Sequence, residues 1–133
     1  MKGSLHMRPH ERLTLWKRAI EFVVKLYKVT DKFPKEEKFG LTSQIRRAAV
    51  SVPANVAEGA GRQSQKEFLH FLSNAQGSAS ELSTELLIAF RLGYISSAEY
   101  DAVDQELNEI GRMIVGLCRQ ISAKIAANNL SAK

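Results

Sequence analysis

The feature that most restricts the fold of this sequence is an apolar spacing of three and four residues, which recurs in four separate segments. Because successive residues of an α-helix lie about 100° apart, this spacing gathers apolar side chains on one face of a helix. It predicts helices near residues 12–32, 41–60, 64–92 and 97–126. The short connections between these segments favour antiparallel packing of neighbours. We therefore expect an all-α fold, an antiparallel up-down four-helix bundle over residues 8–127.

Residues with capping chemistry stand at two of the predicted helix starts. Ser64 with Glu67, and Ser96 with Glu99, match the S-x-x-E capping box, which satisfies amides at a helix N-terminus. Pro53 falls inside the second predicted helix, where proline removes one backbone hydrogen bond. The apolar spacing keeps its phase across this proline, so we expect a kink there and not a break.

Length and composition agree with one such domain. A chain of 133 residues can hold one core but not two, and its 44% of hydrophobic and 25% of charged residues are ordinary for a globular protein. No apolar run approaches the roughly 18 residues of a membrane span, and no segment has the layout of a signal peptide, so we expect a cytoplasmic location. Residues 1–7 resemble an expression-vector remnant, and residues 128–133 are expected to form a C-terminal tail.

The first predicted helix is apolar over two stripes. We assign to the bundle core the stripe formed by Leu13, Trp16, Ile20, Val23, Tyr27 and Thr30. A second stripe lies about 120° around the helix and consists of Leu15, Ala19, Phe22, Leu26, Val29 and Phe33. Every helix of a four-helix domain lies at its surface, so one core covers only part of this apolar arc. The second stripe is predicted to pack between the subunits of a cyclic oligomer; the alternative is that it covers loops or terminal segments.

Polar residues form matching stripes on the second and third predicted helices. From the connecting turn outward, the expected pairs are Arg62 with Glu67, Glu58 with His70, Asn55 with Asn74, Ser51 with Ser78, Arg47 with Glu81, and Gln44 with Glu85. Each pair is complementary in charge or hydrogen bonding, and unpaired polar groups are costly to bury. The pattern predicts a structural polar ladder between the two helices. The same spacing also allows both stripes to face solvent or another subunit.

The net charge of +5 is distributed unevenly. Residues 1–66 hold 14 Lys and Arg against 6 Asp and Glu, and the remainder holds 5 against 8. On the first predicted helix one arc of about 100°, interrupted only by Glu21, carries Lys17, Arg18, Lys25, Lys28 and Lys32. Such an arc is either a solvated surface or, repeated around a ring, a contact for the phosphates of RNA or DNA. No aromatic residue lies within it, which predicts weak sequence preference.

Residues typical of catalytic and metal sites are few. Glu67 and His70 form one E-x-x-H element, whereas di-iron bundles use this element twice. His6 and His10 lie near the N-terminal end, so the histidines of one chain do not assemble a metal site. Cys118 lies on an apolar helix and is interpreted as a core residue. The phosphate-binding glycine motifs are absent as well, and we expect no enzyme activity, metal or cofactor.

A family resemblance rests on one continuous run and on positions that follow it. The run Gln44 to Gly59 reads QIRRAAVSVPANVAEG, and it is followed by Gly61, Arg62, Phe68, Phe71, Leu72, Ser78 and Glu81. From Leu13 past Cys118 the chain resembles the four-helix-bundle proteins encoded in intervening sequences of bacterial 23S ribosomal RNA genes. It is also similar to the accessory variability proteins of diversity-generating retroelements. The resemblance implies an up-down bundle, a homopentameric ring, and a role in binding nucleic acid or a nucleic-acid enzyme.

The residues and the resemblance lead to one functional expectation and one alternative. We expect a non-enzymatic, homo-oligomeric protein that binds the backbone of RNA or DNA, with no membrane partner. The alternative is a protein-interaction scaffold that docks another enzyme or complex without contacting nucleic acid directly.

Overall fold

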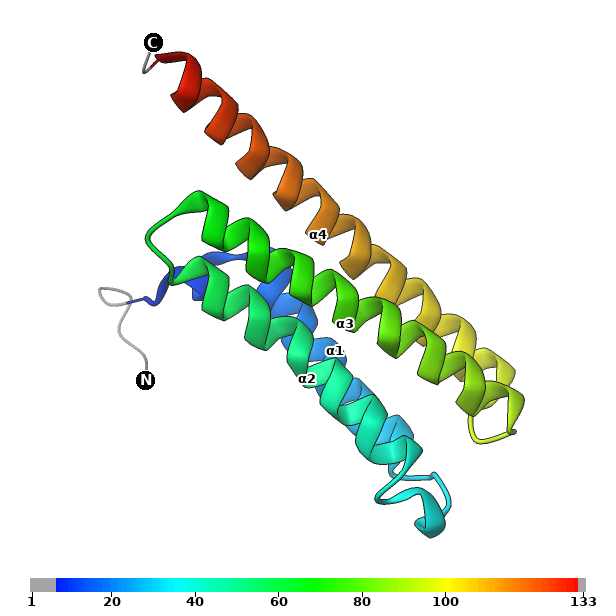
Figure 1. Cartoon of the computed structure of the whole chain (residues 1–133). Coiled ribbons are helices and arrows are strands. Elements are labelled where there is room, and N and C mark those ends of the chain that lie inside the picture. Colours follow the sequence, from blue (N-terminus) through cyan, green and yellow to red (C-terminus); the bar gives the residue numbers. More distant parts are fainter. Residues whose placement is uncertain (1–6, 132–133) are drawn as a thin grey trace.

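Four α-helices account for most of the chain in the computed structural model, which describes residues 7–131 (Figure 1). Their bounds are α1 Thr14–Thr30, α2 Leu41–Ala60, α3 Gln65–Arg91 and α4 Ser97–Ser131, with short 3-10 turns η2 at Pro9–Arg12 and η3 at Lys35–Glu37. Within residues 7–131 there is no strand. The all-α fold with four helices is therefore confirmed.

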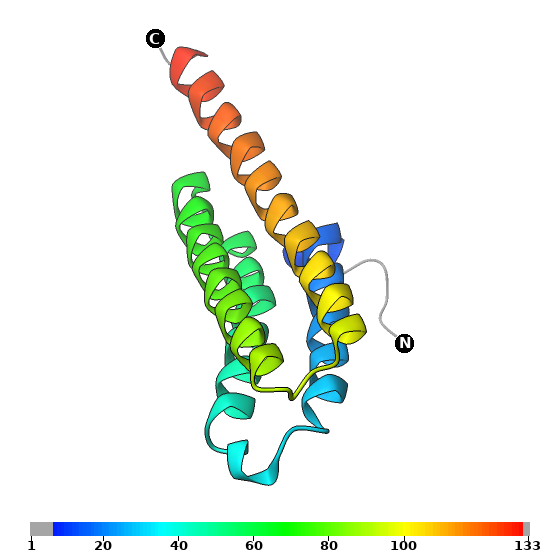
Figure 2. The same ribbon diagram turned by 90° about the vertical axis from the view of Figure 1, so that its right-hand side faces the viewer.

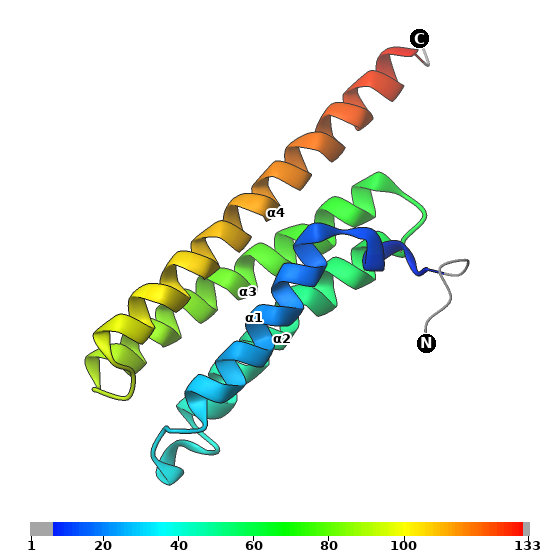
Figure 3. The same cartoon turned by 180° about the vertical axis from the view of Figure 1, so that it is seen from behind.

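The fourth helix is longer than expected. It continues to Ser131, so residues 128–131 are helical and do not form the predicted tail. Residues 122–131 contain neither glycine nor proline, which are the usual signals for a helix end. Figures 1 and 3 show the last turns of α4 projecting beyond the other three helices. Residues 1–6 of the predicted remnant and residues 132–133 lie outside the described part of the chain.

The helix ends follow local chemistry. Ser64 Oγ accepts a hydrogen bond from the amide of Glu67 at 3.0 Å, and Ser96 Oγ accepts one from the amide of Glu99 at 3.1 Å. Gly93 follows the end of α3 with a φ of 81°, a conformation that glycine adopts without strain. Helix α2 runs on through Pro53, whose side chain is buried.

The core contains the stripe of α1 that was predicted to lie between subunits. All six of its residues are buried within the single chain: Leu15, Ala19, Phe22, Leu26, Val29 and Phe33. That prediction is wrong. The other stripe, which was predicted to be core, is only partly covered, with Ile20 38% and Tyr27 42% exposed. The physical reason is that the buried stripe is wholly apolar, whereas Trp16 and Tyr27 carry polar atoms that favour a position near the surface. Thr30, at the end of the other stripe, is buried.

Helices α2 and α3 approach closely where α2 ends. A Cβ atom added to Gly59 would lie 2.8 Å from Phe68 Cδ1 and 2.8 Å from Phe71 Cβ. Only a glycine fits this distance without a shift of its neighbours. The glycine at the end of the AEG sequence therefore sets how closely the two helices pack.

Candidate nucleic-acid interface

The predicted basic arc lies on α1 and, with Lys32, just past its end, and three of its five cations are paired with α4. Arg18 binds Glu109 at 2.6 Å, Lys25 binds Glu106 at 2.6 Å and Lys32 binds Glu99 at 2.5 Å. As the residue number rises along α1 it falls along α4, so these two helices run antiparallel, as Figure 2 shows. The hydrogen bond from Lys32 lowers the pKa of Glu99, which keeps this carboxylate ionised.

The two remaining cations of the arc are different. Lys17 and Lys28 are exposed and make no ion pair within residues 7–131. Of the five cations in the predicted arc, only these two have no acidic partner within residues 7–131, because acids of α4 partly neutralise the others. The spacing of residues within α1 could not predict these ion pairs, because they join residues as much as 91 positions apart.

The polar ladder between α2 and α3 forms only at its centre. The hydroxyls of Ser51 and Ser78 lie 2.8 Å apart, as predicted. Asn55 turns back along its own helix and donates to the carbonyl of Ser51 at 2.8 Å and to its hydroxyl at 3.0 Å. Arg62 pairs with Glu58 of its own helix at 3.0 Å, and not with Glu67. The outer positions are exposed and make no interhelical ion pair within residues 7–131: Gln44, Arg47, Glu67, His70, Asn74 and Glu81. Exposed polar side chains lose little by remaining unpaired, because solvent is accessible to them, so nothing forces them to pair across the helices.

Glu85 is the one ladder residue that is fully buried, with 5% of its surface exposed. Its Oε1 atom has no hydrogen-bond partner. Burial, and then the neighbouring Glu81 carboxylate, raise the pKa of Glu85 to about 7. The predicted partner Gln44 is exposed and makes no hydrogen bond to it. This carboxyl is therefore protonated or only partly ionised at neutral pH.

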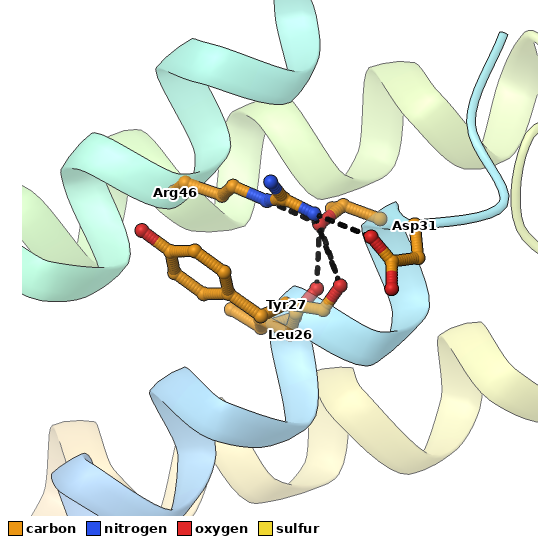
Figure 4. A network of polar contacts seen from close by, with 5 residues as sticks. Leu26, Tyr27, Asp31 and Arg46 are labelled. Atoms are coloured by element: carbon orange, nitrogen blue, oxygen red, sulfur yellow. Dashed lines mark hydrogen bonds and ion pairs between the residues drawn. The ribbon is translucent and has the colours of Figure 1, made fainter. Parts of the chain in front are cut away.

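Arg46 makes the main polar contact between α1 and α2, and sequence spacing did not reveal it. Its Nε donates to Thr30 Oγ1 at 2.8 Å, and its Nη2 donates to the Tyr27 carbonyl at 3.1 Å and to Asp31 Oδ1 at 3.2 Å (Figure 4). The guanidinium also lies 4.4 Å from the centre of the Tyr27 ring. The last carbonyls of a helix lack partners within it and attract cations. The preference of helix C-terminal ends for cations was the signal in the sequence that could have indicated the Arg46 contact.

An exposed apolar face is formed by residues of α1, of α2 and of the connection between them. We call it the outer apolar face; it consists of Ile20, Val24, Tyr27, Phe39 and Val50. Val24 is 52% exposed and Phe39 is 90% exposed. Tyr27, Phe39 and Val50 line a shallow hollow of about 480 Å³. Helix α1 thus has two apolar sides, as the sequence indicated. The side predicted to lie between subunits is buried in the core, and the exposed side includes Ile20 and Tyr27, which were predicted to be core.

A second hollow, the α3/α4 groove, has a volume of about 750 Å³. It is lined by Gln76, Ala79, Ser80 and Ser83 of α3 and by Leu107, Asn108, Gly111, Arg112, Val115, Gly116 and Arg119 of α4. Figures 1 and 3 show the two helices diverging from the turn that joins them. No sequence pattern indicated this groove, because the serines, glycines and asparagine of its lining follow no apolar or charged periodicity.

The described residues contain no group of three His, Cys, Asp or Glu side chains placed to hold a metal ion. His10 packs on Trp16 with 4.8 Å between ring centres, and His70 packs on Phe71 at 5.5 Å. Burial raises the pKa of the half-buried Cys118 thiol, which makes it less reactive. None of the helices in residues 7–131 is long and apolar enough to cross a bilayer.

These features define a class of protein. It is a four-helix protein with ion pairs between α1 and α4 and an α2 that continues through an internal proline. Its surface includes the outer apolar face and the α3/α4 groove. The sequence profile of the 23S rRNA-intervening sequence proteins matches residues 11–116, and the chain belongs to this family. No curated protein sequence matches it.

A crystal structure supports the fold. It is that of a protein of unknown function from the S23 ribosomal protein family of Bacteroides thetaiotaomicron VPI-5482. The two chains are 24% identical, and the match covers 79% of this chain and 95% of the other with a TM-score of 0.73. The family profile ends at residue 116, so the rest of α4 lies outside it.

Proposed function

We propose that this chain is a non-enzymatic cytoplasmic protein that binds the phosphate backbone of RNA or DNA with weak sequence preference. The observation that carries the proposal is the set of exposed cations that have no acidic partner within residues 7–131, chiefly Lys17 and Lys28 on α1 and Arg112 and Arg119 on α4. Phosphate contacts by lysine and arginine supply most of the sequence-independent affinity for nucleic acids. The name of the family, which refers to sequences within 23S rRNA, favours the same class of partner.

The proposal includes assembly into a cyclic homo-oligomer of antiparallel up-down bundles. The outer apolar face supports it, because exposed apolar side chains grouped on two helices and their connection are typical of a protein interface. A second copy of the chain is the occupant we propose, since a ring would repeat the unpaired cations around one nucleic acid. Weak contacts then add through their effective concentration.

The test is a titration of labelled RNA and labelled DNA at several salt concentrations. The affinity should fall steeply as salt rises, and Lys17→Gln/Lys28→Gln should weaken binding and reduce the dependence on salt. Absence of binding to either nucleic acid at low salt would reject the proposal. A single protein captured from lysate after nuclease treatment would then support the alternative, a scaffold that docks another enzyme or complex.

A further inference from the structure

The α3/α4 groove exists because small residues leave it unfilled. Ala79 on α3 faces Gly111 and Gly116 on α4 across the hollow. A Cβ atom added to either glycine would meet no other atom within 4 Å, so larger side chains would fit there. Glycine within a helix destabilises it by roughly 1 kcal/mol relative to alanine. Packing within the single chain thus gives no reason for these glycines, and the hollow that they leave is open to a ligand.

Helix α4 carries five acids, of which three are paired with cations of the basic arc, and the other two, Asp101 and Asp104, lie nearer its N-terminus than the groove. The three paired acids are Glu99, Glu106 and Glu109. Arg112 and Arg119 line the groove on the side of α3, are exposed, and make no ion pair within residues 7–131. No aspartate or glutamate is among the described residues that line it. The groove therefore presents positive charge without a neutralising partner.

The remaining lining matches the chemistry of a sugar-phosphate backbone. The two arginines are seven residues apart, which places their attachment points about 10 Å apart along the helix. Hydroxyls of Ser80 and Ser83 and the amide of Asn108 add uncharged donors for phosphate oxygens. The half-buried Val115 offers apolar contact to sugars. A hollow of about 750 Å³ is of the size of a small-ligand pocket, which suits a short stretch of one strand and not a duplex.

We propose that the α3/α4 groove binds the backbone of a single-stranded nucleic acid, with Arg112 and Arg119 as its phosphate contacts. This inference rests on the proposed function, for which it names the main site and the form of nucleic acid. No aromatic side chain lines the groove, so bases have no stacking platform and sequence preference is weak.

The first experiment removes the charges. Binding of a fluorescein-labelled oligouridylate to the full chain is followed by anisotropy at several salt concentrations. Arg112→Gln/Arg119→Gln should weaken affinity about tenfold and reduce the slope of log affinity against log salt by about 1.4, the value for two single-strand phosphate contacts. Lys35→Gln/Lys38→Gln is the control, because it removes the same charge from exposed residues at the α1–α2 connection. An equal loss in both variants would mean that only net charge matters, and would overturn the site.

The second experiment fills the groove without changing charge. Gly111→Leu/Gly116→Leu should weaken binding about tenfold, while improved helix propensity keeps the chain folded. Gly77→Leu is the matched control: its added Cβ also meets nothing within 4 Å, but Gly77 does not line the groove. Unchanged affinity of the filled variant would overturn the proposal.

The outcomes separate this inference from the proposed function. If the unmodified chain binds neither RNA nor DNA, both fail. If it binds and the groove variants bind equally well, only the groove assignment fails, and the α1 cations remain the contact. Loss of oligomer mass in light scattering on filling the groove would identify a second copy as its occupant, and would also overturn the proposal. Preference for a duplex over a single strand would reject the stated form of nucleic acid.

Discussion

Arg46 of α2 donates a hydrogen bond from Nε to the buried hydroxyl of Thr30, the last residue of α1, at 2.8 Å. The same hydroxyl donates to the Leu26 carbonyl at 2.8 Å, so one side chain links the guanidinium to the end of α1. The two helices are thus joined through the hydroxyl of Thr30 and the carbonyls of the last turn of α1.

Arg46→Ala is expected to lower the free energy of unfolding by about 1–3 kcal/mol, because hydrogen bonds to a charged group near the surface are lost together. Arg47→Ala is the control, since Arg47 is exposed and has no ion pair within the described residues. Thermal unfolding followed by circular dichroism measures both. Equal midpoints for the two variants would show that the network contributes nothing to stability.

Glu85 should make the protein less stable as the pH rises. Its pKa is about 7 in the folded chain against an ordinary 4.5, so between these values the unfolded chain loses a proton that the folded chain keeps. The unfolded state then binds fewer protons, and the free energy of unfolding falls with pH by as much as about 3 kcal/mol before levelling above pH 7.

Glu85→Gln should remove most of that decline and should be more stable than the unmodified chain at pH 8. Denaturant unfolding at pH values from 4 to 8 measures the effect. Glu36→Gln serves as the control, because Glu36 is exposed. Parallel stability profiles for Glu85→Gln and the unmodified chain would contradict the raised pKa.

Two glycines should respond in opposite directions to alanine. At Gly59 the added methyl group would overlap Phe68 and Phe71, and overpacking of this kind costs about 1–3 kcal/mol. At Gly77 the added methyl group meets no atom within 4 Å, and alanine should stabilise α3 by about 0.5–1 kcal/mol. Chemical denaturation distinguishes the two signs, and a stabilised Gly59→Ala would show that the α2–α3 approach is looser than described.

The sequence predicted features that depend on neighbours along the chain. Helix α2 begins and ends at the predicted residues 41 and 60, and Ser64 and Ser96 cap the following helices as expected. The central Ser51–Ser78 contact was also predicted, because two regular helices joined by a short turn have a fixed register. Local periodicity and capping chemistry contain this information.

Features that depend on the packing of distant segments were not predictable in the same way. Both stripes of α1 have helical spacing, and spacing alone does not say which one faces the core. The acids that pair with Arg18, Lys25 and Lys32 lie on α4, far along the sequence. The α3/α4 groove is formed by small residues of two helices that diverge, and small residues carry no periodic signal. Three-dimensional packing decided each of these points.

One apolar side of α1 is buried in the core and the other is exposed, so substitutions on the two sides should affect folding and assembly separately. Phe22 is buried in the core of the single chain, so Phe22→Asp should unfold the protein, because a charge without a partner is strongly disfavoured there. Val24, two residues away, is 52% exposed on the outer apolar face. Val24→Asp should leave the helical content unchanged but dissociate the proposed oligomer, since charge is depleted from the cores of protein interfaces. Light scattering and circular dichroism on the same samples measure mass and folding together. A monomeric mass for the unmodified chain at micromolar concentration, or an intact oligomer in Val24→Asp, would exclude this face as the interface.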